Sequence, residues 1–184
     1  MSDPDASTAD RHSRDASIVL GLCLPADVVL YLLLPVHAEQ FGVSLAQAGV
    51  LLAANRLVRI AGYGWVARLY AERGDRVVCT LAALASACCA LGYALFPGFW
   101  LLLAVRLLWG LSYAALNLST LALATASLSG SAQRTGRSRA LIAAGPMVAL
   151  PAGAWLADLA GPRFIFFILA ALALLALPLA RRLP

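Results

Sequence analysis

The chain has 184 residues, of which 62% are hydrophobic and 12% charged, and its mean hydropathy is +0.84. Soluble domains have about a quarter charged residues, so this composition excludes an ordinary soluble domain and indicates an integral membrane protein. The net charge of +5 does not indicate a nucleic-acid surface, because the basic residues are all arginines, in short clusters between apolar segments.

Enzyme and metal motifs are absent from the sequence. The four cysteines lie inside apolar segments without CxxC spacing, where they behave as small hydrophobic residues. Neither HExxH nor GxSxG occurs, and His12 and His37 lie outside the apolar segments. We therefore predict no enzyme activity, no metal site and no cofactor.

The first 15 residues are polar and lack the layout of a signal peptide, which predicts a disordered cytoplasmic tail. Six segments then approach the roughly 20 apolar residues that span a bilayer, and each must be helical to satisfy its backbone in lipid. We expect one six-helix transmembrane bundle over residues 16–184. Its predicted helices cover residues 16–36, 45–69, 77–96, 99–121, 140–157 and 164–179.

The connections between these segments alternate in charge. One side of the membrane receives ten arginines, from the tail, the second-to-third link, the fourth-to-fifth link and the C-terminus, and the other side receives only Arg163. Because arginine-rich connections remain in the cytoplasm, we expect both termini there.

A short internal repeat relates the two halves of the chain. The sequence WVARL at residues 65–69 recurs ninety residues later as WLADL, and the same offset places Asp27 over Asn117. An offset of three helices reverses membrane orientation, so the repeat predicts an inverted three-plus-three arrangement.

The second apolar segment contains two arginines, in AANRLVRIAGYG. A guanidinium inside a bilayer costs about 2.5–3.5 kcal/mol on insertion-based scales, so Arg56 and Arg59 indicate a functional or structural partner. Asn55 and Arg59 lie one turn apart on the helix, and Arg56 and Tyr63 occupy a neighbouring sector.

Polar side chains also follow one face of the first and fourth segments. Asp27 and Tyr31 are one turn apart and follow Pro25, which predicts a kink. We expect these faces to be buried against one another around water. The face of the fourth segment has the spacing i, i+4, i+7, i+11 and consists of Arg106, Gly110, Tyr113 and Asn117.

Several motifs resemble those of the major facilitator superfamily of transporters. Between helices two and three that family carries Gly-x-x-x-Asp-Arg-x-Gly-Arg-Arg, and this chain has GWVARLYAERGDRVV. Its register is shifted, since Arg68 follows Gly64 by four residues, where the family has aspartate, and Glu72 is the acidic residue. RLLWG resembles the Arg-x-x-x-Gly of the family's antiporters, LPAGAW a degenerate Gly-Pro-x-x-Gly-Gly, and GPRFIFF the usual start of helix six.

The resemblance is to the amino-terminal six-helix half of such a transporter, and it implies that helices one, four and part of two line a central cavity. Asp27 lies about 16 Å from the cytoplasmic end of its helix and Arg106 about 10 Å from the outer end of its own, so the long arginine can bridge the gap. Burial favours a neutral carboxyl group and a nearby guanidinium favours a charged one. We expect Asp27 to carry protons with Arg106 as its counter-charge. The alternative is a static pair that holds two helices together.

Three intramembrane arginines and one aspartate leave two positive charges to be neutralised. This excess favours an anionic or carboxylate-bearing substrate, with Arg56, near mid-depth, as its expected contact. The alternative is that Arg59 reaches interfacial water and that backbone carbonyls or a missing half neutralise Arg56. Arg59 is a second expected substrate contact. Further substrate contacts, with helix packing as the alternative, are Tyr31, Asn55, Tyr113 and Asn117.

In the family, the charged link between helices two and three latches one half against the other and gates the inward-facing change. The alternative role is ordinary cytoplasmic anchoring by positive charge. The counterparts of the gating link in this chain are Gly64, Arg68, Glu72, Arg73, Gly74 and Arg76.

The expected function is therefore secondary active transport of a small solute by alternating access, with proton coupling, in a bacterial inner (plasma) membrane. Family members have about twelve helices, so we expect this chain to be a fragment of a transporter, a split half or a unit that pairs with a second copy. The expected partners are membrane lipid, a small-molecule substrate, protons and a second six-helix half, which is a separate chain or a second copy. The alternative is a membrane partner or regulatory protein that keeps the bundle and has lost transport.

Overall fold

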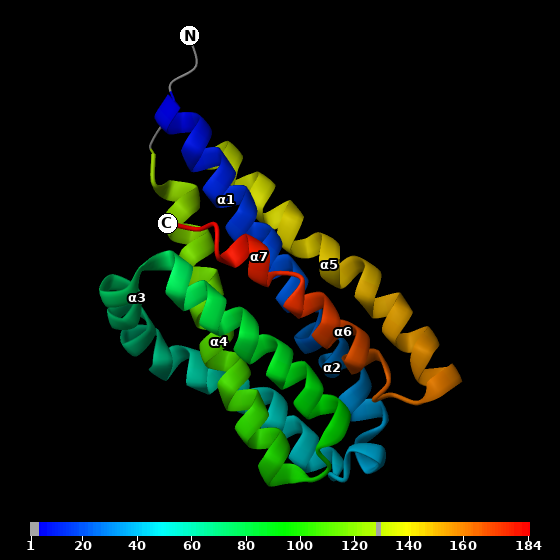
Figure 1. The fold of residues 1–184 in the computed structure, drawn as a ribbon. Helices are drawn as coiled ribbons and strands as arrows, with labels where there is room; N and C mark the ends of the chain where they lie inside the picture. The colour runs from blue at the N-terminus through cyan, green and yellow to red at the C-terminus, as the bar shows by residue number, and fades with distance from the viewer. Residues whose placement is uncertain (1–3, 128–129) are drawn as a thin grey trace.

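The computed structural model describes residues 4–127 and 130–184, and every regular element in these ranges is a helix (Figure 1). The elements are α1 (Pro4–Cys23), α2 (Pro25–Val36), the 3-10 helix η1 (Ala38–Phe41), α3 (Leu45–Leu95), α4 (Phe99–Thr125), α5 (Ser131–Ala160), α6 (Ile165–Leu174) and α7 (Leu177–Ala180).

Four helical stretches in the described ranges are long and apolar enough to cross a membrane, and 165–180 is a shorter apolar stretch. The predicted all-helical membrane fold is confirmed at this level. Six separate spanning helices are not confirmed, because residues 45–95 form one helical element and the last stretch is short. The four long stretches are Ser7–Val36, Leu45–Leu95, Phe99–Thr125 and Ser131–Ala160.

Helix α3 reverses direction at Gly74. The φ angle of Gly74 is 74° and its ψ angle is 172°, a backbone conformation open to glycine because it has no Cβ. A first limb, residues 45–73, and a second limb, residues 75–95, leave this point and lie side by side (Figure 1). The second and third predicted segments fall on these two limbs.

The N-terminal segment differs from the predicted disordered tail, because α1 begins at Pro4. Its polar residues pack against α5: Ser13 and Asp15 are buried, and the Ser17 hydroxyl donates to the Ser138 hydroxyl at 2.8 Å. Helix α5 also begins at Ser131, nine residues before the predicted start, so both helices extend beyond their apolar parts. Polar contacts between the added parts of α1 and α5 explain why both helices are longer than their hydropathy predicts. Residues 1–3 of the predicted tail lie outside the described ranges.

Close helix approaches depend on two glycines. A Cβ atom on Gly145 of α5 would lie 2.1 Å from the carbonyl oxygen of Gly21 on α1. A Cβ atom on Gly110 of α4 would lie 2.2 Å from a methyl carbon of Val58 on the first limb of α3. Helices packed in lipid use small residues to approach in this way. The interruption between α1 and α2 falls at Leu24, directly before the residue predicted to kink the helix.

Candidate functional site

A buried acid lies among α2, α3 and α4. Asp27, on α2, is 4% exposed and forms ion pairs with Arg106 of α4 and Arg59 of α3. The Arg59 Nη2 atom lies 3.2 Å from the Asp27 Oδ2 atom, and Arg106 Nη1 contacts Asp27 Oδ1. The side-chain amide of Asn55 donates to Asp27 Oδ1 at 3.3 Å. We refer to Asp27, Asn55, Arg59 and Arg106 as the Asp27 cluster.

Arg106, like Asn55, has no exposed surface. Its Nε atom donates to the carbonyl oxygen of Leu51 at 3.3 Å, and its guanidinium carbon lies 5.0 Å from the centre of the Tyr31 ring. Its Nη2 atom is buried and has no hydrogen-bond partner in the described part of the chain, as is also true of Tyr93 Oη and Trp109 Nε1. The protein thus holds the Arg106 charge away from solvent, beside the Tyr93 hydroxyl.

Arg59 is the accessible cation of the cluster, because its side chain is 20% exposed. Its Nε atom donates to the Asn55 side-chain oxygen at 3.2 Å, and its guanidinium carbon lies 3.6 Å from the centre of the Tyr113 ring. Asn55 therefore orients both Arg59 and Asp27. Aromatic contact and the carboxylate together stabilise a cation that still reaches the surface.

The close packing of α4 on α3 positions these groups. Gly110 faces Asn55 so closely that a Cβ atom would lie 3.0 Å from the Asn55 carbonyl oxygen. Arg106 lies one turn before Gly110 on the same face, so the contact that Gly110 permits also lets Arg106 reach the Leu51 carbonyl. Removing one partner from a buried ion pair typically costs about 3–5 kcal/mol, so the stability of the fold depends on this close packing.

Arg56 lies apart from the cluster. It is exposed on the first limb of α3, whereas Arg59, three residues later, turns toward Asp27. Of the two arginines expected to contact substrate, Arg59 is the one that lies beside the buried acid.

Two of the other predicted substrate contacts, Tyr31 and Asn117, form hydrogen bonds with α3. The Tyr31 hydroxyl donates to the Leu52 carbonyl oxygen at 3.1 Å, and the Asn117 amide donates to the Tyr63 hydroxyl at 3.2 Å. Both bonds join α3 to another helix. Tyr31 and Tyr113 also border the cluster through their rings, while Asn117 is bonded away from it.

The predicted gating residues surround the reversal of α3. Gly74 forms the reversal itself, and the backbone N–H of Arg76 donates to the Pro184 carbonyl oxygen at 2.9 Å, which ties the end of the chain to this point. The other members are exposed: Gly64, Arg68, Glu72 and Arg73.

Asp75, which is not among the predicted functional residues, accepts hydrogen bonds from two helices. It follows Gly74 directly and accepts hydrogen bonds from the hydroxyl groups of Tyr70 and of Ser119 on α4. The sequence does show this acid, in the GDR of the loop motif, but the predicted acidic residue of the motif is Glu72. Asp75 attaches the reversal of α3 to α4.

Apolar helices of spanning length, joined by a buried acid and two arginines, define a polytopic membrane protein with a polar centre. The sequence model of the Major Facilitator Superfamily matches residues 16–184. The chain therefore belongs to the Major Facilitator Superfamily, a family of membrane transporters rather than enzymes. No curated protein matches the chain.

Proposed function

We propose that the chain is one six-helix half of a secondary transporter, arranged as an inverted three-plus-three repeat. The 51 residues of α3 would extend about 77 Å as one straight helix, against a hydrocarbon core of about 30 Å. The reversal at Gly74 supports one crossing by each limb. Helices α6 and α7, residues 165–180, would together supply the sixth crossing.

The transported solute is proposed to be a small anion that contacts Arg59. The Asp27 cluster contains one acid and two arginines, so one positive charge is not balanced within it. Arg59 carries that charge nearest the surface, since Arg106 is fully enclosed. Arg59 therefore replaces Arg56 as the proposed substrate contact, with Tyr113 and Tyr31 at the border of the same site.

Proton coupling is proposed to operate through Asp27. The single observation that carries this proposal is that one carboxylate forms ion pairs with two arginines from different helices. A proton on Asp27 weakens both ion pairs and frees Arg59 for an anion, so proton and anion binding favour each other. Loss of both restores the pairs and draws α2, α3 and α4 together, which changes the packing between inward-facing and outward-facing states.

A second six-helix half is proposed to complete the cavity. Within its apolar window α5 is only 22% buried, compared with 67% for the window in Ser7–Val36. A separate chain or a second copy would cover this face, with both termini cytoplasmic in a bacterial inner membrane. The link around Gly74 would then gate the movement of one half against the other.

The test is proton flux in proteoliposomes that contain the purified chain and a pH-sensitive dye, with a panel of carboxylates and phosphates added outside. The Asp27→Asn chain should lose anion-dependent proton flux, and Arg59→Gln should lower anion affinity about tenfold, the effect of about 1.4 kcal/mol. Arg56→Gln is the matched control and should stay within about twofold. Unchanged proton flux in Asp27→Asn would contradict the proposal.

A non-transporting membrane partner is the second candidate. The observation that favours it is that both carboxylate oxygens of Asp27 are already paired with arginines, as a static joint between helices requires. In that case the chain carries no flux with any solute, and Asp27→Asn still binds its protein partner after a loss of stability.

A further inference from the structure

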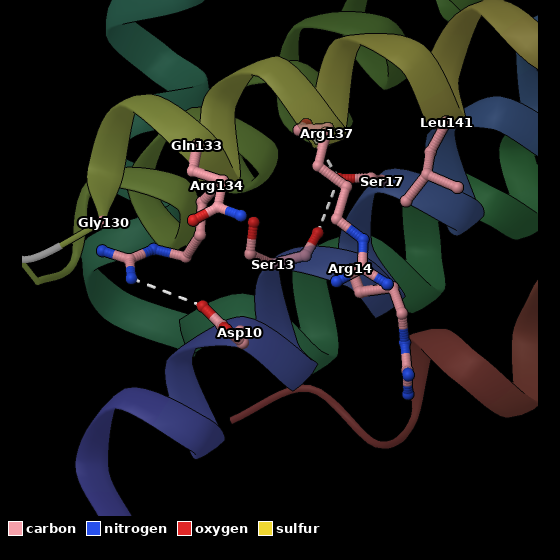
Figure 2. Close-up of a pocket in the computed structure, with 10 residues that line it drawn as sticks. Asp10, Ser13, Arg14, Ser17, Gly130, Gln133, Arg134, Arg137 and Leu141 are labelled. Carbon is pink, nitrogen blue, oxygen red and sulfur yellow. Dashed lines mark hydrogen bonds and ion pairs between the residues drawn. The ribbon is translucent and has the colours of Figure 1, made fainter. Parts of the chain in front are cut away.

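A second basic site, which shares no residue with the Asp27 cluster, lies between the middle of α1 and the first turns of α5. It is a cavity of about 210 Å³, and Figure 2 shows α1 and α5 forming its two walls. Its charged lining consists of Asp10 and Arg14 from α1 and of Arg134 and Arg137 from α5. We refer to these four residues as the basic pocket.

Arg134 is the fixed wall of the basic pocket. Its side chain is 7% exposed, and its Nε atom donates to the carbonyl oxygen of Ala124 at 3.0 Å. Its two terminal nitrogens reach the carbonyl oxygen of Ser127 and, at 3.4 Å, the carboxylate of Asp10 (Figure 2). Arg134 thus joins the end of α4 and α1 to α5, and its charge is partly balanced by Asp10.

One further arginine of the basic pocket has no counter-charge. The side chain of Arg137 makes no hydrogen bond or ion pair with any residue that the structure describes, and it is exposed. Among the described residues Arg14 pairs with its neighbour Asp15, at 3.5 Å, so Asp15 offsets its charge. The lining alone has three arginines and one aspartate, a net charge of +2, and Asp15 beside it reduces this to +1. The planar donor sets of guanidinium groups favour phosphate.

The position of the basic pocket also indicates a membrane phosphate. Polar residues line it, while Leu141 closes the side from which the apolar part of α5 continues. A phosphate at this level would lie where the polar ends of both helices enter their apolar stretches, which is the depth of lipid headgroups. An acyl chain could then follow α5 past Leu141.

We propose that the basic pocket binds a phosphate group, held by Arg137, oriented by the fixed Arg134 and bordered on the α1 side by Arg14, and that an anionic phospholipid supplies it. The site does not depend on transport or on the Asp27 cluster. An occupied pocket joins α1 to α5 through a shared anion, so the lipid would stabilise the contact between these helices.

The experiment titrates dioctanoyl phosphatidylglycerol into the full chain in detergent micelles and counts bound copies by native mass spectrometry. One copy should bind saturably, and Arg137→Gln should weaken its binding about tenfold, because one charge-assisted contact is lost. Arg139→Gln is the matched control: Arg139 is exposed on α5, two residues away, and does not line the cavity. Its affinity should stay within about twofold of the unaltered chain.

Competition separates the two sources of phosphate. If inorganic phosphate does not displace the lipid, the site is a lipid headgroup site; if millimolar phosphate displaces it, the site also takes soluble phosphate groups, and the proposed phosphate chemistry stands. The proposal is overturned if no copy binds saturably, if dioctanoyl phosphatidylcholine binds equally well, or if Arg137→Gln and Arg139→Gln weaken binding equally. Equal unfolding midpoints of the two variants without lipid establish that both are folded.

Discussion

Arg106 and Arg137 are both arginines on long helices of this protein, yet Arg106 has no exposed surface whereas Arg137 is exposed and unpaired among the described residues. Arg106 belongs to the Asp27 cluster, where an acid, an amide and a backbone carbonyl meet the charges. Arg137 belongs to the basic pocket, where two of three arginines lack a partner from another helix. The two sites contain similar groups in different surroundings.

Solvation explains the difference. In the apolar interior an unpaired charge is costly, so the Asp27 cluster must supply its own counter-charges. At the polar end of the helices, water and headgroups can solvate a guanidinium, so the basic pocket can keep arginines free for a ligand. Removing a charged partner should therefore cost much stability in the Asp27 cluster and little at the exposed positions of the basic pocket.

The largest effect is expected for Arg106→Gln. It removes a fully enclosed ion-pair partner of Asp27 and should lower the free energy of unfolding by about 3–5 kcal/mol, measured by SDS titration of the micellar protein. The double variant Asp27→Asn, Arg106→Gln should be destabilised by less than the sum of the single variants, since neither charge is then left alone. Additive losses would show that the two residues do not interact.

Arg134→Gln should have an intermediate effect. Arg134 is the one enclosed arginine of the basic pocket, and its hydrogen bonds to two carbonyl oxygens and Asp10 would be lost. Hydrogen bonds from charged groups contribute about 1.5–3 kcal/mol, so we expect a loss of about 2–3 kcal/mol in the same titration. Arg139→Gln should change it by less than about 0.5 kcal/mol. If Arg134→Gln lowers the free energy of unfolding no more than Arg139→Gln does, the hydrogen bonds of the buried Arg134 do not stabilise the fold.

The smallest effect of the three is expected for Gly110→Ala, which pushes α4 away from α3 at the Asp27 cluster without removing a charge. The added Cβ would lie 2.2 Å from Val58 and should cost about 1–2 kcal/mol through overpacking. Gly49→Ala is the control, because nothing lies within 4 Å of its added Cβ, and it should be neutral or stabilising by about 0.4–1 kcal/mol. Equal midpoints for the two variants would contradict the close approach.

Much of the Asp27 cluster could be predicted because depth in a membrane is readable from sequence. Counting residues from helix ends placed Asp27 and Arg106 within reach, and the ion pair between them is present. The choice between Arg56 and Arg59 could not be made in this way. Three residues turn a helix by about 300°, so these arginines point only about 60° apart, and a small rotation decides which one faces inward. The contact at Gly110 sets that rotation.

The N-terminal helix could not be predicted from hydropathy, because residues 4–15 carry no apolar pattern of their own. Their order comes from polar contacts with a segment more than a hundred residues away, as in the bond from Arg134 to Asp10. Asp75 was missed for a related reason. Its donor Ser119 lies on α4, and nothing near Asp75 in the sequence indicates that α4 passes beside it.

The amino-acid sequence alone determined that the chain is a helical membrane protein of the transporter family and that Asp27 needs a cationic partner, because apolar length and the cost of buried charge are local properties. Only the tertiary structure decided that Arg59 shares this acid, that α1 starts at Pro4 and that Arg137 remains without a partner among the described residues in the pocket between α1 and α5. Those outcomes depend on how helices distant in the chain rotate and pack against one another.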